Sequence, residues 1–593
     1  MPKAIARLLC SLSLALGLLC PVLADDLNRV TLVRIGQHGD TLRLVLETDQ
    51  APVCQVYQRS KPERLVIDLV GAELPNNLRR PTPRAPWLLS SNLQQENLSR
   101  VRWTLNLRER IPASQIKTEV LDNPPRLVVD IDPYYAREET IALSSGLKWN
   151  RREAANSTGY LLWNDVSYSL DDPKVRLDVG LAQDRLDARE TVSSMVRRTG
   201  ARVGINGGYF ATSGGPLGLV VKEGKLLAPH VGRRPPRTAL AQTRDRKVSF
   251  SRIAARGGKL VSTDGNTWTD VLLALGGGPQ LVHRGAIALT TDQEALGRSG
   301  NDITRSCGRT ALATTRDGRM LLATAAGWRD THTQGLRLEE LASRLIRRGA
   351  VEAMNLDGGA SVDMVIGGDV VGSGPGSTTR EKPVATAVLV HDEHPATYPE
   401  RIQLKVEESS LPADGSSTTR VVAEVTAPGG QSVPDGTPIR FLGDRARLSA
   451  YATTVKDGRA SVELTSLRLP GPGLVRVECG GARAEESLRY LAGSPRRLRA
   501  GLVRQRYQAP GQLAVVAVQV DDEWGNPVGS VPIRCAESDF QIPTDGSLQL
   551  EIPFELKGGT VTIESAGLSA VTVTVGAMEA PLAPSPSPSP KAR

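Results

Sequence analysis

Two glycine-rich segments contain the polar residues best placed to do chemistry. Asp357 comes directly after the apolar run 351–354 and is followed by Gly358 and Gly359. A carboxylate at the end of a strand, followed by two glycines, allows the backbone to approach a ligand closely. Asp357 is therefore the candidate catalytic carboxylate. The alternative is a structural aspartate that binds the amides of its own loop.

A second segment repeats this design earlier in the chain. The short apolar run 203–205 ends in Asn206, Gly207, Gly208, Tyr209 and Phe210. In both copies a helical pattern, two arginines and a glycine precede the strand. We expect the two loops to open on one side of one sheet and to form a site together. Two unrelated tight turns are the alternative.

The elements that must hold these loops follow from apolar spacing. The residues Leu338, Leu341, Ala342, Leu345 and Ile346 recur at helical spacing, and Gly349 ends the pattern. Val192, Met195 and Val196 predict a shorter helix over 191–198, which ends at Gly200. Each predicted helix is thus followed by a strand that ends at a glycine loop.

Several further side chains suit a sugar or a phosphate. Arg237 and Arg309 each precede Thr-Ala-Leu-Ala, and a guanidinium binds phosphate through two parallel hydrogen bonds. An ion pair at a strand edge is their alternative. Asn206 and Asn355 could bind sugar hydroxyls, although asparagine beside glycine is common in turns. The remaining candidates are three rings for stacking or core packing, and a loop histidine for proton transfer or phosphate binding: Tyr209, Phe210, Trp328 and His230.

Five segments carry a family resemblance. They are, in chain order, GINGGYF, GRRPPRTALA, GGGPQLV, GRTALATTRDGRMLLAT and AMNLDGGAS. Over residues 146–392 the sequence resembles the phosphodiester glycosidase domain family. The resemblance implies hydrolysis of a sugar-1-phosphodiester, with Arg237 or Arg309 holding the phosphate and Arg380 closing the site. Two departures concern substrate choice: Ala360 replaces a third glycine, and Ala326 stands where the family often has an aspartate.

Length and composition limit the remaining possibilities. The 593 residues predict several domains, and the low aromatic content of 4% with 57 glycines suits β-rich modules with many turns. The net charge of +9 could favour anionic envelope polymers. A dense basic tract with interleaved aromatic residues is missing from the sequence, so nucleic acid is not a predicted partner.

The first 24 residues read as a secretory signal peptide. Lys3 and Arg7 precede the apolar run 8–19, and Val22-Leu23-Ala24 supplies a small-residue cleavage site. We expect cleavage after Ala24, export to the periplasm or cell surface, and no transmembrane segment. The remaining cysteines, expected as free thiols rather than a disulfide, lie far apart: Cys54, Cys307, Cys479 and Cys535. A cysteine nucleophile at Cys307 is a minor alternative.

A β module is predicted before the central domain, over residues 25–135. Its strands are expected at 41–47, 64–69 and 126–131, and the last two read RLVIDL and RLVVDI. This module resembles the AMIN domain, which implies a β-sandwich that binds peptidoglycan. Asp68 and Asp130 are expected on solvent-exposed faces of strands. A polar linker is predicted over 133–145.

Two further β-sandwiches are predicted after the central domain, over 400–492 and 496–577. Alternating strands separated by turns such as PADGSS and PDGT resemble invasin-type bacterial Ig-like domains, whose usual role is spacing or adhesion. Asp521, Asp522 and Glu523 suggest either a calcium ligand set or a solvated turn. Residues 578–593 form a Pro/Ser-rich tail, expected to be disordered.

The sequence therefore predicts a multidomain, exported envelope hydrolase. Its fold class is an AMIN-like β-sandwich, a central α+β domain with a mixed sheet and helices, and two Ig-like sandwiches. The predicted substrate is a sugar-1-phosphodiester in an envelope polysaccharide, exopolysaccharide or other glycan. No cofactor is predicted, and calcium is left open. The alternatives are a non-catalytic cell-wall glycan-binding protein, an adhesive surface protein and a hydrolase of ordinary glycosides.

Overall fold

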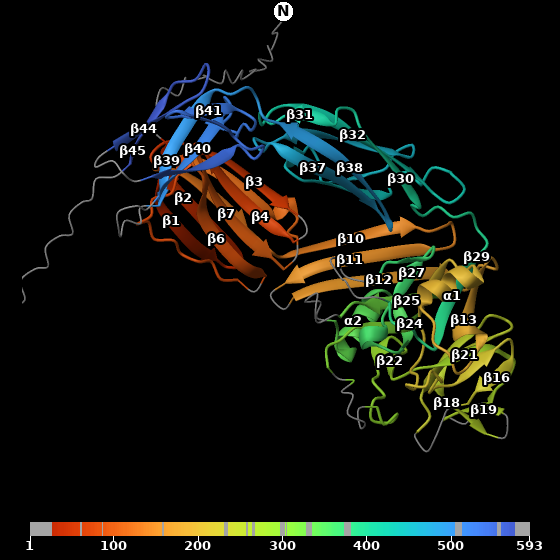
Figure 1. The fold of residues 1–593 in the computed structure, drawn as a ribbon. Coiled ribbons are helices and arrows are strands. Elements are labelled where there is room, and N and C mark those ends of the chain that lie inside the picture. Colours follow the sequence, from red (N-terminus) through yellow and green to blue (C-terminus); the bar gives the residue numbers. More distant parts are fainter. Residues whose placement is uncertain are drawn as a thin grey trace, which may run out of the picture.

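The computed structural model describes most of the chain after residue 26. The described residues are 27–59, 62–85, 87–108, 110–156, 159–229, 235–256, 259–263, 267–296, 303, 305–327, 335–372, 381–504, 513–553 and 559–575. They form a multidomain, β-rich molecule (Figure 1). The predicted signal peptide, its cleavage site and the Pro/Ser tail lie outside these residues.

The N-terminal unit is a sandwich of two sheets. One sheet has the strand order β5 (Ala72–Glu73), β1 (Asn28–His38), β2 (Thr41–Thr48), β9 (Pro125–Ile131), β8 (Ile116–Asp122). The other has the order β3 (Val53–Arg59), β4 (Arg64–Val70), β7 (Arg100–Leu107), β6 (Leu88–Asn97). Alternating residues of β4 and β7, among them Ile67 and Trp103, meet residues of β2 and β9 in the core between the sheets.

The central unit contains three sheets. An eight-stranded sheet has the order β10 (Tyr135–Ala142), β11 (Lys148–Asn156), β12 (Gly159–Ser169), β25 (Arg319–Ala325), β24 (Arg309–Thr315), β26 (Ala350–Asn355), β22 (Gln280–His283), β23 (Ala286–Ile287). A five-stranded sheet has the order β13 (Val175–Leu181), β29 (Thr386–Asp392), β14 (Val203–Asn206), β27 (Met364–Ile366), β28 (Asp369–Val370).

The third sheet of the central unit lies beside the other two. Its order is β16 (Lys225–Ala228), β15 (Val220–Lys222), β21 (Val271–Gly276), β17 (Thr238–Thr243), β18 (Val248–Arg256), β19 (Lys259–Ser262), β20 (Thr267–Trp268). One apolar core joins all three sheets, because Met354, Ile205 and Leu275 come from different sheets and belong to the same buried cluster.

Both predicted helices are present. α1 (Val192–Thr199) begins at its N-cap Thr191 and ends at Gly200, whose φ of 69° is left-handed. α2 (Leu338–Arg347) buries Leu338, Leu341, Ala342 and Leu345 and is followed by Gly349 at φ 91°. The strands after them, β14 and β26, carry the two glycine loops, as the sequence predicted.

Three expectations for the central unit are corrected. The two glycine loops leave different sheets, since β14 and β26 belong to the five-stranded and eight-stranded sheets. The described strand pairs of this unit are antiparallel rather than mixed. The expected linker 133–145 contains β10, an edge strand whose charged residues pair with those of β11.

The two C-terminal units are sandwiches, as expected for Ig-like domains. The first packs the order β30 (Arg401–Val406), β32 (Thr418–Thr426), β36 (Arg459–Ser466), β34 (Ala446–Leu448) on β31 (Ser410–Pro412), β38 (Ala482–Leu491), β37 (Gly471–Cys479), β33 (Pro438–Gly443), β35 (Ala452–Thr454). The second packs β39 (Arg497–Arg504), β40 (Leu513–Asp521), β43 (Ser547–Pro553) on β42 (Ser538–Gln541), β41 (Pro532–Cys535), β44 (Gly559–Glu564), β45 (Val571–Val575).

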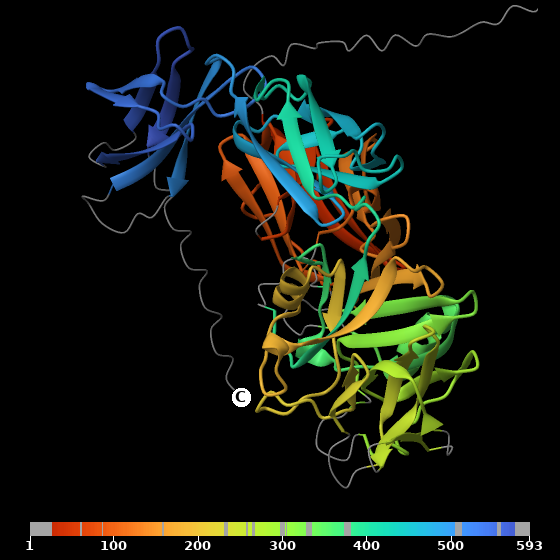
Figure 2. The same cartoon turned by 90° about the vertical axis from the view of Figure 1, so that its right-hand side faces the viewer.

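The N-terminal unit lies against both C-terminal units (Figures 1 and 2). Tyr57 and Val66 form one apolar cluster with Leu467 and Leu469 of the first Ig-like unit. Arg100 donates to the carbonyl of Arg468 at 2.9 Å. This docking corrects the expectation for Asp68, which is fully buried and accepts hydrogen bonds from Arg102 rather than facing solvent.

The second Ig-like unit docks through buried polar groups. Gln519 donates to the Ser99 hydroxyl at 2.9 Å and accepts from the Leu98 amide. Asp521 accepts from Arg499, while Asp522 accepts from backbone amides, including those of Trp524 and Asn526. Asp521 and Asp522 are buried, so the expected solvated turn is wrong for these two residues. Both carboxylates are engaged in hydrogen bonds within the second Ig-like unit, and Asp521 also accepts from Gln519, the residue that contacts Ser99.

Two smaller points concern the whole chain. Cys54, Cys307, Cys479 and Cys535 are free thiols, as expected, with the last two buried and the first two half-buried. In the part of the chain that the structure describes, no helix is both long and apolar enough to span a bilayer.

Candidate active site

The sequence motifs of the central unit meet one another at backbone contact distance. A Cβ on Gly208 would lie 2.1 Å from the carbonyl oxygen of Gly276, and a Cβ on Gly277 would lie 2.6 Å from that of Asn355. Side chains cannot be accommodated at such distances, so these glycines are required for the segments to pack. The glycine loops therefore build the site by close packing against one another.

Asn206 at the end of β14 joins the two glycine loops. It is fully buried and donates from Nδ2 to the main-chain carbonyl of Asp357 at 2.8 Å. Its Oδ1 accepts from the Thr310 hydroxyl at 2.6 Å and from the Asp363 amide at 3.3 Å. The Asp357 amide in turn donates to the carbonyl of Gly207 at 3.1 Å. These bonds favour a positioning role for Asn206 over the predicted contact with a sugar hydroxyl.

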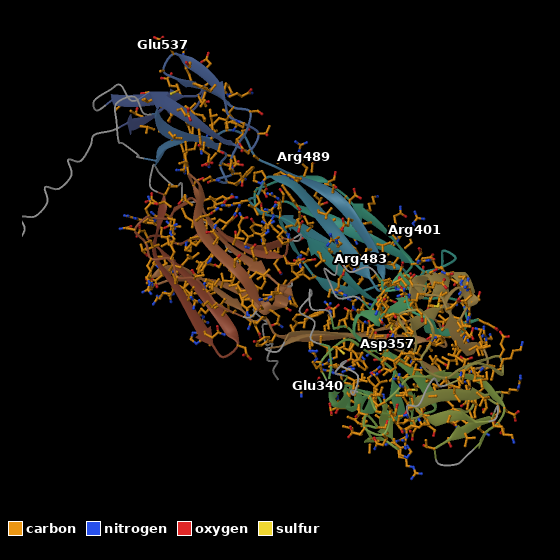
Figure 3. The ribbon with its side chains drawn as sticks, turned by 60° about the horizontal axis from the view of Figure 1, so that its bottom comes forward. Glu340, Asp357, Arg401, Arg483, Arg489 and Glu537 are labelled. Carbon is orange, nitrogen blue, oxygen red and sulfur yellow. The ribbon has the colours of Figure 1, made fainter. Side chains whose placement is uncertain are left out.

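Asp357 lies where β26 ends, inside the central unit (Figure 3). Its Oδ1 accepts from the Gly358 amide at 2.9 Å. Burial raises the pKa of the Asp357 carboxyl, while hydrogen bonds from Ser361 and Gly358 and the charges of Lys382 and Arg237 act against that rise. Asp357 as a residue is half-buried, and its carboxyl is desolvated by the surrounding loops.

Tyr209 lies close enough to Asp357 to feel its charge, and its hydroxyl is bonded to Asn355. Asn355 donates to the Tyr209 hydroxyl at 2.9 Å, and that hydroxyl donates to the carbonyl of Gly278 at 3.0 Å. Burial raises the pKa of the Tyr209 phenol, and the negative charge of Asp357 raises it further. Tyr209 is therefore neutral at physiological pH. Asn355 is fully buried and, like Asn206, positions neighbouring groups of the site through hydrogen bonds.

The two predicted phosphate-binding arginines differ in their surroundings. Arg237, just before β17, places its guanidinium 5.0 Å from the ring centroid of Tyr209 and acts electrostatically on Asp357. Arg309 at the start of β24 is 2% exposed and donates to the carbonyls of Leu336, Ile303 and Arg305. The charges of both arginines act on the Tyr209 hydroxyl, and Arg237 also contacts its ring. Arg309 in addition anchors the neighbouring loop.

Three site residues were missed by reasoning from sequence. Lys382 donates from Nζ to Ser361 Oγ at 3.2 Å, and Ser361 bonds to the Asp357 carboxyl. The sequence pattern that pointed to Arg380 could also have identified Lys382, because both residues precede the last strand of the domain. Glu294 is fully buried and accepts from the amide and hydroxyl of Thr238. Glu294 lies in an irregular segment with no periodicity, so no sequence signal identified it.

Asp363 is a second carboxyl close to this network. It faces Asn206 across the β14–β27 pair and is 1% exposed, and its Oδ2 has no hydrogen-bond partner among the described residues. Burial raises the pKa of Asp363 to about 8, with a further contribution from the charge of Glu381. Asp363 therefore carries a proton at neutral pH.

Three predicted substrate-binding residues lie outside the described residues: His230, Trp328 and Arg380. Gly358 and Gly359 follow Asp357 as expected; Gly358 packs against the carbonyl of Gly308, while a Cβ on Gly359 would meet no atom within 4 Å. Among the described residues, no group of three or more His, Cys, Asp or Glu side chains is arranged to hold a metal ion.

Comparison with known proteins identifies two domains of the chain. Residues 199–391 match the phosphodiester glycosidase family, and residues 33–131 match the AMIN domain family. The first match contains Asn206, Asp357 and both candidate arginines. The chain thus resembles an AMIN domain over residues 33–131 and a phosphodiester glycosidase domain over residues 199–391.

Named relatives match the central region. N-acetylglucosamine-1-phosphodiester alpha-N-acetylglucosaminidase of Mus musculus is 29% identical over 227 residues, covering 36% of this chain and 41% of that protein. The Homo sapiens protein is 27% identical over 218 residues, covering 34% and 40%. The chain thus spans about two fifths of the length of the curated relatives it matches. The catalytic domain of the zebrafish enzyme aligns at 19% identity with a TM-score of 0.35, covering 44% of this chain and 88% of that one.

Proposed function

We propose that the central domain hydrolyses a sugar-1-phosphodiester, with Asp357 acting at the anomeric carbon and Arg237 binding the phosphate. The observation that carries this proposal is the position of Asp357. Its half-buried side chain lies at the junction of two glycine loops, where the charge of Arg237 acts on it. The match to the phosphodiester glycosidase family supports the same chemistry.

The leaving group explains why one carboxylate suffices. An ordinary glycosidase uses a second carboxylic acid to protonate the leaving oxygen. A phosphate monoester leaves readily without such help, because its second pKa is only about 6. The site must then supply a carboxylate at the sugar and positive charge at the phosphate. Asp357 supplies the carboxylate and Arg237 the positive charge. The charge of Arg309 also acts on the site, through its effect on Tyr209.

The proposed step balances as a hydrolysis. A water oxygen forms the new bond to the anomeric carbon, its proton passes to Asp357, and the bond from that carbon to the phosphate oxygen breaks. The electron pair leaves with the phosphomonoester. If Asp357 instead attacks the carbon first, water releases the sugar in a second step. The first route inverts the anomeric configuration and the second retains it, so the configuration of the product separates them.

The surrounding domains support an envelope substrate. The AMIN match and the predicted signal peptide favour an exported protein that meets peptidoglycan and cell-surface polysaccharides. We infer that the AMIN domain binds peptidoglycan in the periplasm or at the cell surface. On this proposal the central domain cleaves phosphodiester-linked sugars of an envelope polysaccharide or related glycan.

The test is product release by the purified chain from residue 25 onward, on a panel of sugar-1-phosphodiesters. The expected products are free sugar and phosphomonoester. Asp357→Asn should lose about 10³-fold in kcat/KM, as expected when a positioned proton acceptor is removed. The matched control is Asp245→Asn in the fully exposed turn between β17 and β18. No release from any member, together with retained binding to isolated cell-wall glycan, would favour a non-catalytic glycan-binding protein.

A further inference from the structure

Lys382 occupies a position that the catalytic scheme above does not use. It lies four residues before β29, its side chain is exposed, and its Nζ donates to Ser361 Oγ at 3.2 Å. Among the described residues it makes no ion pair with a carboxylate. Its positive charge nevertheless acts on Asp357. Lys382 is therefore an accessible, unneutralised cation at the edge of the candidate site.

Two consecutive aromatic residues hold the two cations of the site. The Arg237 guanidinium lies 5.0 Å from the ring centroid of Tyr209, and the Lys382 ammonium lies 5.4 Å from that of Phe210. A cation over a ring face is attracted by the negative charge density there. The Tyr209–Phe210 pair thus presents one guanidinium and one ammonium beside a single carboxylate.

Ser361 connects the second cation to the carboxylate. Its hydroxyl accepts from Lys382 and also hydrogen-bonds to Asp357. Ser361 is buried in the short turn Gly359–Ser361, so this connection is fixed by the fold. The hydroxyl stands between the ammonium and the carboxylate, so each keeps hydrogen-bonding capacity for a ligand.

We propose that Lys382 is a second phosphate ligand, which acts with Arg237 on the leaving phosphate and gives the site its selectivity for phosphate-linked sugars. This inference rests on the proposed function. A bound phosphodiester carries one negative charge, and the departing phosphomonoester gains a second as the bond to the sugar breaks. A positive group already in place stabilises that additional charge without reorganisation. Lys382 should therefore contribute to kcat as well as to binding.

The ammonium chemistry fits this role. Arginine presents a rigid planar fork, whereas lysine is a compact point charge with three rotatable donors on a flexible stem. One of the three protons is already directed to Ser361, which leaves the others for phosphate oxygens. A neutral aglycone brings no phosphate charge to the two cations, so its cleavage should depend on them less.

The experiment compares Lys382→Met, Lys382→Arg and the control Lys225→Met, which changes an exposed lysine of β16. Each variant is assayed on a sugar-1-phosphodiester and on the nitrophenyl glycoside of the same sugar, with inorganic phosphate as inhibitor. Lys382→Met should lose about 10²-fold in kcat/KM on the phosphodiester. Losses of this size are typical when one preorganised hydrogen-bond donor to a developing negative charge is removed. Its activity on the nitrophenyl glycoside should change little, inhibition by phosphate should weaken, and Lys382→Arg should recover most of the loss.

Two results would overturn the inference. One is a Lys382→Met variant that behaves like Lys225→Met. The other is an equal loss on both substrates with unchanged inhibition by phosphate, which would show that Lys382 only maintains the shape of the site. If the wild-type chain cleaves neither substrate, the proposed function fails. Calorimetric binding of inorganic phosphate to wild type and to Lys382→Met then tests Lys382 directly, and equal affinities would reject its role.

Discussion

Asn206 donates its side-chain amide to the main-chain carbonyl of Asp357 at 2.8 Å and thereby fixes one glycine loop on the other. The same amide oxygen accepts from Thr310 and from the Asp363 amide. One buried side chain thus joins β14, β24 and the segments on both sides of the turn after β26. Asn206 therefore helps to position the candidate catalytic carboxylate, together with the bond from the Asp357 amide to the carbonyl of Gly207.

Replacing Asn206 by alanine should lower both stability and turnover. The change leaves a buried hydroxyl, amide and carbonyl with a lost partner, which costs about 1–3 kcal/mol for each unsatisfied group. We expect a lower melting temperature and a reduced kcat with KM changed less, because the carboxylate is displaced while Arg237 stays in place. The control is Asn92→Ala on the exposed side of β6. A variant with the stability and kcat of that control would contradict the positioning role.

The pH dependence of activity should show the environment of Asp357. Burial raises the pKa of this carboxyl, and the reaction requires the ionised form. The rate should therefore fall as the pH falls through a midpoint above about 4, the ordinary value for aspartate. Lys382 opposes the rise, so Lys382→Met should move the acid limb of kcat/KM to higher pH. An acid limb at the ordinary value in both proteins would place the essential group elsewhere.

Asp363 should make stability fall with rising pH. Its pKa is raised by burial to about 8 in the folded chain, above the ordinary value of an unfolded aspartate. Between these two values the folded chain holds a proton that the unfolded chain has released. The stability that protonated Asp363 contributes is therefore fully present below about pH 4. It is lost as the pH rises toward the folded-state pKa of this carboxyl.

Asp363→Asn should remove this dependence. The neutral amide avoids the cost of a buried charge, so near pH 8 the variant should be more stable than wild type by up to about 5 kcal/mol, which corresponds to a shift of about four pKa units at roughly 1.4 kcal/mol per unit. Near pH 4 the two should be closely similar. Thermal unfolding at several pH values measures the difference, with Asp292→Asn, an exposed change, as the control. Parallel curves for Asp363→Asn and wild type would exclude a shifted Asp363.

The docking of the N-terminal unit on the first Ig-like unit should hold in solution. Leu469 is buried in the apolar cluster that also contains Tyr57 and Val66. Leu469→Asp places a charge in that contact, so the radius of gyration from X-ray scattering should increase. Hydrolysis of a small soluble phosphodiester should be unaffected. Leu491→Asp changes a leucine that is 44% exposed and should leave the scattering unchanged. Equal scattering for both variants would argue against a docked arrangement.

The local elements of the site could be predicted, because they depend on residues close in sequence. Apolar spacing and a terminal glycine were sufficient for α1 and α2, and the apolar runs after them for β14 and β26. Asp357 could be proposed because a carboxylate followed by glycines is uncommon at a strand end. The packing role of the glycines could not be predicted, because the residues they contact lie far away in the sequence. Gly208, for example, packs against Gly276.

The errors have a common physical origin in contacts between distant segments. Asp68 alternates with apolar residues and so resembles a solvent-facing position, but another domain covers that face of the sheet. The polar sequence of β10 resembles a linker, but Arg137 pairs with Glu153 on the neighbouring strand. Asn206 and Asn355 could bind a sugar or belong to turns on sequence grounds alone, and only the folded chain shows that both are fully buried.

The central claim is that the chain breaks the bond between the anomeric carbon and the phosphate oxygen, and it is tested most directly by hydrolysis in ¹⁸O-labelled water. Mass spectrometry of the two products shows which one has gained the water oxygen. Attack at the anomeric carbon predicts the label in the released sugar and none in the phosphomonoester. Label in the phosphomonoester would show attack at phosphorus, and Asp357 could then not have the role assigned to it.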